Sequence, residues 1–120
     1  MTLELVLITL LFVKHFIVDF PLQKPYHYLN KGTYGHPGGI QHAVFHGVGT
    51  TLALAIFNPF LAVVAGAIDF FIHYHVDWAK VRLNNHYGLK PDNSEYYWWL
   101  LGADQLAHAL TYIAIVAFVF

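Results

Sequence analysis

Apolar residues dominate four long stretches of the chain, and short polar or glycine- and proline-rich stretches separate them. A helix that crosses a lipid bilayer needs about 20 mostly apolar residues. The pattern predicts such helices at about 2–20, 40–57, 60–83 and 96–120. We therefore expect an all-α fold with one integral membrane domain, residues 1–120. It would be an antiparallel four-transmembrane-helix bundle with both termini on the same side.

The stretches between the predicted helices carry residues that end or begin a helix. Pro21 and Pro25 follow the first apolar stretch, and proline does not continue a helix. Asn58 and Pro59 form a tight turn before the third stretch, and Ser94 is suited to cap the start of the fourth. The first stretch has neither a basic beginning nor a cleavage site of small residues, so we expect a retained helix and no cleaved signal peptide.

Ionisable residues interrupt all four apolar stretches at a spacing of four residues. They are His15 and Asp19, His42 and His46, Asp69, His73 and Asp77, and Asp104 and His108. Residues four apart lie on one face of a helix. Because an isolated charge in hydrocarbon costs at least about 2.5–3.5 kcal/mol, we expect these groups to face one another.

The expected depth of these groups is the same in every helix. When successive helices run in opposite directions, all four sets fall roughly 5–15 Å below one membrane surface, at about 1.5 Å per residue. The other half of each helix contains no Asp or His. Randomly placed residues would be scattered over both halves, so this pattern indicates one shared pocket.

Imidazoles and carboxylates around a common centre are ligands for divalent metal ions. The chain has nine histidines and no cysteine, which excludes thiolate sites and disulfides. The predicted metal ligands are His15, Asp19, His42, His46, His73, Asp77, Asp104 and His108. This set suits one or two divalent transition metal ions, with Zn, Mn and Fe as the candidates. The alternative is a structural or proton-carrying network without a metal.

Composition and charge agree with lipid as the surrounding medium. Hydrophobic residues make up 58% and charged residues 11%, whereas soluble domains are about half apolar and a quarter charged. The net charge of −1 does not favour binding to nucleic acid. Lysine and arginine flank the two long connections, which places these in the cytoplasm and both termini outside. Membrane lipids are the expected partners, and a homo-oligomer is compatible with the sequence.

Three signatures resemble a known family: "HFIVDFPLQ" (15–23), "HYHVDWAK" (73–80) and "DQLAHALT" (104–111), with His42 and His46 between the first two. The family comprises small bacterial and phage integral membrane proteins grouped as domain of unknown function 3307. The resemblance spans nearly the whole chain and implies a multi-pass protein of the bacterial inner (cytoplasmic) membrane, but no activity. The arrangement is also similar, by analogy alone, to that of predicted membrane-bound metal-dependent hydrolases.

The function we expect first is metal-dependent hydrolysis of a lipid-linked phospho- or acyl ester at the cytoplasmic face. A metal-bound water would attack the ester, and Asp69 would act as general base. One alternative is a metal or proton transporter or sensor, although the apolar outer half offers no continuing polar path. Another is a non-enzymatic phage accessory protein.

The remaining polar residues have expected places around this centre. Gln23, Gln105 and Thr111 are candidates to hydrogen-bond the ligands. Lys14 is expected to extend its ammonium group from the first helix toward the membrane surface. The loop histidines are expected to be solvated: His27, His36 and His86.

Overall fold

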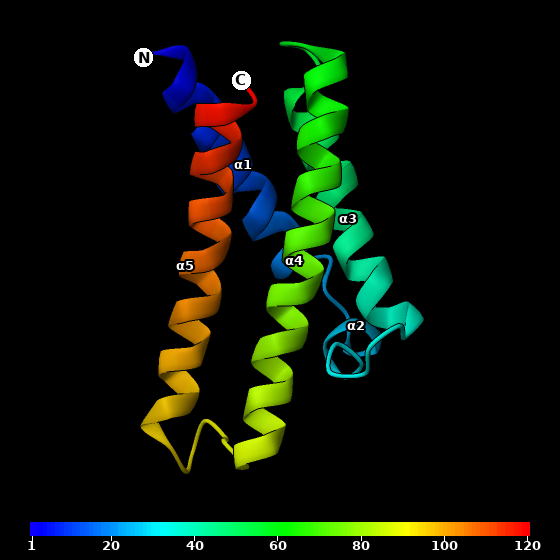
Figure 1. Ribbon diagram of the computed structural model, residues 1–120, viewed down its shortest axis with the longest axis vertical. Helices are drawn as coiled ribbons and strands as arrows, with labels where there is room; N and C mark the ends of the chain where they lie inside the picture. The colour runs from blue at the N-terminus through cyan, green and yellow to red at the C-terminus, as the bar shows by residue number, and fades with distance from the viewer.

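Four long helices and one short helix make up the structure, a computed structural model that describes residues 1–120. The helices are α1 (Leu3–Asp19), α2 (Pro25–Tyr28), α3 (Pro37–Leu54), α4 (Pro59–Tyr87) and α5 (Glu95–Phe118). There is no strand, which confirms the all-α class. The long helices run in alternating directions, and both termini lie at one end of the molecule (Figure 1).

Each long helix begins at a polar capping side chain. Thr2, His36, Asn58 and Ser94 each accept a hydrogen bond from a backbone N–H two or three residues further along. Such caps satisfy backbone donors that the first turn leaves free. His36 is therefore a structural cap, and it makes α3 begin earlier than the predicted residue 40.

The end of α4 is set by Gly88, whose φ of 63° lies in the left-handed region that glycine adopts without strain. The helix therefore runs to Tyr87, beyond the predicted end at residue 83. The short helix α2 was not predicted. It begins at Pro25, whose fixed φ suits the first position of a helix.

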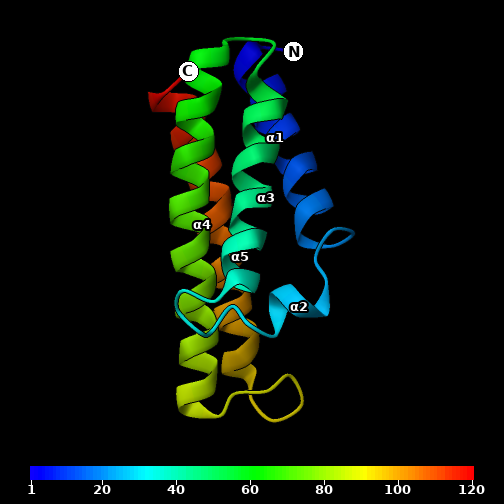
Figure 2. The ribbon, with the colours of Figure 1, turned by 90° about the vertical axis from the view of Figure 1, so that its right-hand side faces the viewer.

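The four long helices form a bundle in which each helix packs against two neighbours. Helix α3 packs against α1 and α4, and α5 packs against α1 and α4. The backbones of α1 and α4, and those of α3 and α5, face each other across the interior without close approach, and only side chains bridge α1 and α4. Helix α2 packs on α3, beside the part of the molecule far from the termini (Figure 2). At this far end α4 and α5 extend beyond α1 and α3 (Figure 1).

The closest approach between two helices is where α3 crosses α4 at Gly47 and Gly66. A Cβ atom on Gly47 would lie 2.9 Å from the carbonyl oxygen of Gly66, and one on Gly66 would lie 2.6 Å from that of Gly47. Neither position has room for a side chain. This contact brings the inner faces of α3 and α4 close enough for their histidines to meet.

The interior has two levels. The level near the termini is apolar and contains Leu7, Leu11, Leu54, Ala62, Ala65, Tyr112, Ile115 and Val116. Below it the interior is polar, and over the whole molecule buried polar and charged side chains outnumber buried apolar ones. Lys, Asp and His are seldom fully buried in proteins unless they are paired, so this second level calls for a specific explanation.

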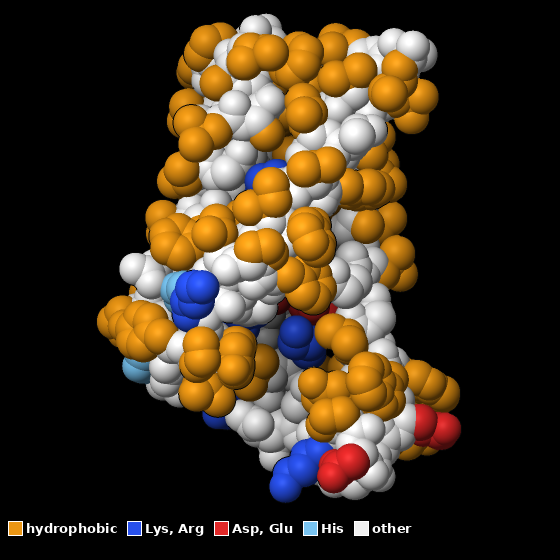
Figure 3. Space-filling view, turned by 180° about the vertical axis from the view of Figure 1, so that it is seen from behind, with side chains coloured by type: hydrophobic (Ala, Val, Ile, Leu, Met, Phe, Trp, Pro, Cys, Tyr) orange, Lys and Arg blue, Asp and Glu red, His pale blue; other side chains and the backbone are white.

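The outer surface is largely apolar. Large apolar side chains cover most of the face shown in Figure 3, and the charged side chains at the surface gather toward one end. Phe16, Phe71 and Leu106 are 58%, 63% and 59% exposed. A soluble monomer rarely exposes contiguous apolar surface on this scale, which indicates contact with a membrane or a partner.

Two helices, α4 and α5, are long and apolar enough to cross a bilayer. Only 28% and 33% of the most apolar 18-residue segment of α4 and α5, respectively, is buried, so neither helix resembles the core helix of a soluble protein. Two of the four predicted spanning helices therefore have the length and apolar composition needed to cross a bilayer. Helix α1 has 17 residues and extends only about 26 Å, short of a hydrocarbon core of about 30 Å.

Candidate metal centre

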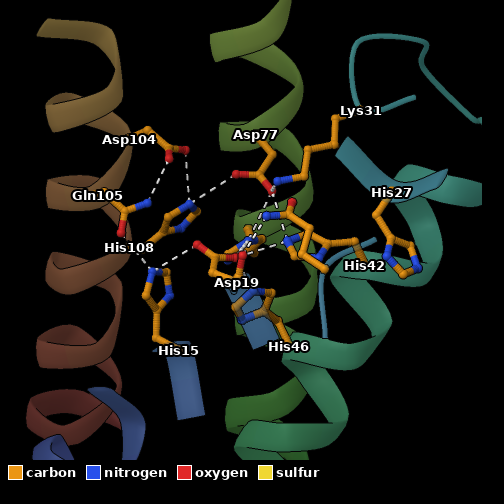
Figure 4. Close-up of polar contacts among 12 residues, drawn as sticks. His15, Asp19, His27, Lys31, His42, His46, Asp77, Asp104, Gln105 and His108 are labelled. Atoms are coloured by element: carbon orange, nitrogen blue, oxygen red, sulfur yellow. Dashed lines mark hydrogen bonds and ion pairs between the residues drawn. The ribbon is translucent and has the colours of Figure 1, made fainter. Parts of the chain in front are cut away.

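The polar level of the interior brings together all eight side chains that the four-residue spacing predicts as ligands. Each long helix contributes two of them, as Figure 4 shows for most of the set. They are His15 and Asp19 from α1, His42 and His46 from α3, His73 and Asp77 from α4, and Asp104 and His108 from α5. The expected shared pocket is therefore present, whereas the role of its members as ligands stays a prediction.

Asp19, the last residue of α1, lies at the centre of this group. Its Oδ1 atom is 2.7 Å from Nε2 of His46, 3.1 Å from Nε2 of His42 and 3.6 Å from Nε2 of His73. Its Oδ2 atom is 3.0 Å from Nε2 of His15. Four imidazoles from three helices thus surround one carboxylate.

Asp77 is the second carboxylate of the group. Its Oδ2 atom lies 3.1 Å from Nε2 of His73 and 3.5 Å from Nε2 of His42. Its Oδ1 atom lies 3.2 Å from Nε2 of His108. His42 and His73 therefore each approach both Asp19 and Asp77, and they join the two carboxylates into one cluster.

Two overlapping groups within the cluster have metal-site dimensions. Asp19, His42, His46 and His73 offer ligand atoms that all lie within 4.8 Å of one another, and so do His73, Asp77 and His108. His73 belongs to both groups. Of the eight predicted ligands, His15 and Asp104 lie outside both.

Four atoms form a closed circuit inside the cluster: Oδ1 of Asp19, Nε2 of His42, Oδ2 of Asp77 and Nε2 of His73. Its sides measure 3.1, 3.5, 3.1 and 3.6 Å. Ligand atoms at about 2.0–2.2 Å from a tetrahedral ion lie about 3.3–3.6 Å apart. We call these four residues the ligand circuit. Its sides are close to this spacing, whereas Asp19 and Asp77, at opposite corners, do not belong to the same group.

Unpartnered polar atoms are concentrated on the ligand circuit. Both ring nitrogens of His73, Nδ1 of His42 and Oδ2 of Asp77 are buried and make no well-aligned hydrogen bond. The Asp77 oxygen has cations and imidazoles nearby, so its contacts are electrostatic. Each buried unsatisfied group costs about 1–3 kcal/mol. An ion in the ligand circuit would bind two of these atoms, Nε2 of His73 and Oδ2 of Asp77, and would remove their cost, so the residues present fit a metal.

The histidine rings are also arranged unusually. The ring of His73 stacks between those of His46 and His108, with centroids 3.5 and 3.8 Å apart. The three rings present their Nε2 atoms to the two carboxylates (Figure 4). Stacking of parallel imidazoles is compatible with neutral rings, and neutral rings are the form that ligates a metal.

Three lysines each pair with one aspartate around the cluster. The ion pairs are Lys14–Asp69 at 2.7 Å, Lys31–Asp77 at 3.0 Å and Lys80–Asp104 at 3.2 Å. Asp19 has no lysine partner and contacts only histidines. With neutral histidines the buried groups therefore carry one uncompensated negative charge. A proton on an imidazole or a bound cation would compensate it.

Lys14 corrects one expectation, because it does not extend toward the membrane surface. Its side chain is 5% exposed, and its ammonium group contacts Asp69, Nδ1 of His46 and the hydroxyl of Tyr112 at 2.7, 3.0 and 3.0 Å. Three donors thus meet three acceptors. Because Lys14 donates to Nδ1 of His46, the Nε2 atom of His46 carries a proton toward Asp19. Ligation by His46 would release this proton.

Asp69 lies one helical turn from His73, away from the ligand circuit. It accepts hydrogen bonds from Lys14 at 2.7 Å and Thr50 at 2.6 Å and is 1% exposed. These contacts make Asp69 the counter-ion of Lys14. The general-base role that the sequence suggested for Asp69 stays a prediction.

Two residues between α1 and α3 are buried, and one of them, His27, was expected to be solvated. His27 is 4% exposed, with its Nε2 atom 2.7 Å from Oε1 of Gln41. Lys31, in the glycine-rich loop, is 7% exposed because its ammonium group reaches Asp77. His36 is the cap of α3, and His86 is exposed as predicted.

The expected hydrogen-bonding partners of the ligands are only partly those predicted. Gln105 contacts Nε2 of His15 at 2.9 Å and donates to Asp104 at 3.0 Å. Gln23 and Thr111 instead bond backbone carbonyl groups. Tyr112 was missed, although its hydroxyl lies 2.7 Å from Nδ1 of His15. A signal existed, because Tyr112 follows His108 by four residues.

Comparison with known protein families identifies the family to which the chain belongs. A family model described as "Protein of unknown function (DUF3307)" matches residues 7–120, and the chain therefore belongs to this family, as its signatures suggested. Neither the curated proteins nor the solved structures contain a match. The interpretation of the site therefore depends on its geometry.

Proposed function

We propose that this member of the DUF3307 family is a multi-pass membrane protein that binds one or two divalent transition metal ions and hydrolyses an ester of a lipid-linked substrate. The observation that carries the proposal is the ligand circuit. It combines two carboxylates and two imidazoles at metal-site spacing with several unpartnered atoms on the same four residues.

The membrane part of the proposal extends from two helices to four. Helices α4 and α5 qualify by length and hydropathy. Helices α1 and α3 pack alongside them and carry large exposed apolar side chains, including Phe12 and Val48. A bilayer can thin locally around a short helix at modest cost. We place the polar level near the cytoplasmic face of the bacterial inner membrane, with both termini on the opposite side.

The ligand circuit would hold the first ion through Asp19, His42, His73 and Asp77. If a second ion binds, Asp77 and His108 of the other group would hold it, because the Nε2 atom of His73 can bind only one ion. Zn, Mn and Fe all accept such imidazole and carboxylate ligands. An ion bound there would supply an activated water and a Lewis acid for the ester.

The chain's own residues would position this chemistry. Gln105 and Tyr112 hold the ring of His15, which in turn donates toward Asp19. Asp104 lies outside both ligand groups, and its Oδ1 atom is 3.1 Å from Nε2 of His108. Both Asp104 and Asp69 are paired with a lysine. We assign the general-base role to Asp104 because it lines a surface groove between α4 and α5, whereas Asp69 is 1% exposed and lies one helical turn from the ligand circuit.

Hydrolysis fits the interior better than conduction does. A transporter needs polar groups along the whole path between the two membrane faces. Beyond Lys14, Thr50 and Asp69, the interior toward the termini is the apolar level that contains Leu7 and Leu54. A polar pocket closed on one side favours a reaction at one membrane face over transport.

Elemental mass spectrometry of the purified protein is the decisive experiment. We expect one or two transition metal ions per chain in the wild type. His42→Ala and His73→Ala should each lose the ion of the ligand circuit, while the exposed residue change His86→Ala should keep the full content. A wild-type protein without transition metal after purification in metal-supplemented medium would refute the metal site. A metal-loaded protein that hydrolyses no labelled phospholipid or acyl-lipid ester would refute the enzymatic function.

A further inference from the structure

We infer that the substrate is a lipid phosphate ester and that its phosphate group is bound by Lys80, at the inner end of a groove between α4 and α5. The inference rests on the proposed function for its chemistry. Its structural basis is separate, because it concerns the groove and its one lysine, which lie outside the ligand circuit.

The groove reaches the cluster from the molecular surface. It has a volume of about 190 Å³ and is lined by Val76, Ala79, Lys80, Leu83, Leu100, Ala103 and Asp104. Five of these seven side chains are apolar, and the two polar ones are the ion pair Lys80–Asp104. Asp104 contacts His108, and His108 contacts Asp77 of the ligand circuit, at 3.1 and 3.2 Å. A group bound at Lys80 would therefore lie beside the proposed metal ions.

Lys80 is the more accessible of the two lysines of the cluster that have spare donors. The three N–H bonds of Lys14 meet three acceptors. Lys31, like Lys80, has one aspartate partner, but its side chain is only 7% exposed. The side chain of Lys80 is 18% exposed and has one hydrogen-bond acceptor, Asp104. An ammonium group has three donors, so two remain for an anion in the groove.

The charge balance favours an anion over a neutral ester. The four buried aspartates and three lysines leave one negative charge when the histidines are neutral. A divalent ion would convert this to one positive charge in a poorly solvated interior. A phosphate group would compensate that charge, whereas a neutral acyl ester would leave it in place.

The apolar lining of the groove suits the chain of an amphiphile. Leu83, Leu100 and Ala103 line the groove together with Lys80 and Asp104. Figure 3 shows acidic and basic side chains recessed in a hollow between apolar side chains at this lower part of the molecule. A phosphate at the inner end and an alkyl chain along the apolar walls would match both features.

The reaction can be written for a phosphate monoester of a lipid alcohol. The oxygen of water bonds to phosphorus, and the ester P–O bond breaks. One proton of the water passes by way of Asp104 to the departing alkoxide, so the products are the lipid alcohol and inorganic phosphate. Lys80 keeps its protons and only holds the phosphate oxygens. No oxidant or further reactant is needed.

The test measures binding of fluorescent dioleoyl phosphatidic acid to metal-loaded protein in detergent. Lys80→Gln should weaken binding about tenfold or more, as expected for loss of a charged hydrogen bond, and Lys80→Arg should restore most of it. Arg82→Gln, which removes an exposed charge nearby, should bind as the wild type does. Ala103→Leu fills the groove without changing charge and should also weaken binding, whereas Gly102→Leu should not, because the space around Gly102 is open.

The outcomes separate this inference from the proposed function, because metal content and melting temperature are measured on every variant. Wild-type affinity in metal-loaded Lys80→Gln would overturn the inference and leave the metal-dependent hydrolase standing. If glycerol 3-phosphate displaces the fluorescent lipid as well as unlabelled phosphatidic acid does, the groove does not bind the lipid chain, and that part of the inference is overturned. A wild type without metal that still shows the predicted Lys80 dependence would refute the proposed function and support the phosphate site.

Discussion

The buried ion pair between Lys14 and Asp69 allows a quantitative test of the polar interior. Its atoms are 2.7 Å apart, with side-chain exposures of 5% and 1%. Removing one partner of such a pair leaves a buried charge without a counter-charge, which typically costs about 3–5 kcal/mol. We expect Lys14→Met to destabilise the protein by about this amount, and Asp69→Asn to do so by a similar amount.

The double substitution should lower the free energy of unfolding by much less than the sum of the two single substitutions. The asparagine introduced in place of Asp69 would still accept the hydrogen bond of Thr50, and no charge would remain at the site. His46 and Tyr112 would each lose the contact to Lys14, so a residual cost of about 1–3 kcal/mol should persist. The coupling energy between the two positions should then be at least about 3 kcal/mol.

The assay is equilibrium unfolding in mixed micelles, followed by circular dichroism for the wild type, both single variants and the double variant. Retained helix content before unfolding shows that each variant folds. Additive costs, or a cost below about 1 kcal/mol for Lys14→Met, would refute the reasoning. Either result would mean that the ammonium group of Lys14 reaches water, as the sequence suggested, and does not compensate Asp69.

Two further predictions concern the helix crossing and the ion. Gly66→Ala should destabilise the protein by about 1–3 kcal/mol in the same assay, because the added Cβ would overlap Thr51 and the carbonyl group of Gly47. Gly102→Ala, in open space, should not destabilise it. Equal stability of the two variants would contradict the close contact between α3 and α4. A chelator should reversibly lower the melting temperature of the wild type, because an ion present at about 100 times its Kd stabilises the folded protein by about 2.7 kcal/mol. The same chelator should leave the melting temperature of His73→Ala unchanged, which would show that the ion acts through this site.

The placement of the cluster followed from periodicity alone. A spacing of four residues puts side chains on one face of a helix, and the cost of burying charge in an apolar segment makes such faces turn inward. Both arguments are local, so the order of residues was enough to assign the eight ionisable side chains from His15 to His108 to one interior. Extending the same spacing by one step would also have found Thr50 after His46 and Tyr112 after His108.

The pairing of the charges could not be predicted in this way. Lys14 and Asp69 are 55 residues apart, and nothing local shows that they meet. A lysine in an apolar helix ordinarily extends toward the membrane surface. Lys14 does not, because the bundle brings one acceptor each from α3, α4 and α5 to its ammonium group. Lys31 reaches Asp77 only because the loop before α3 folds back over the interior.

The sequence by itself thus determined the helical class, the inward faces and the donor types, because each depends on residues close together in the chain. The tertiary structure decided which inward groups form the ligand circuit and which lysine keeps free donors. It also paired Asp69 with Lys14 and Thr50, which the sequence did not indicate. These outcomes depend on how far each helix slides and rotates against its neighbours. That is set by contacts such as Gly47 against Gly66, where backbones approach only because both side chains are absent.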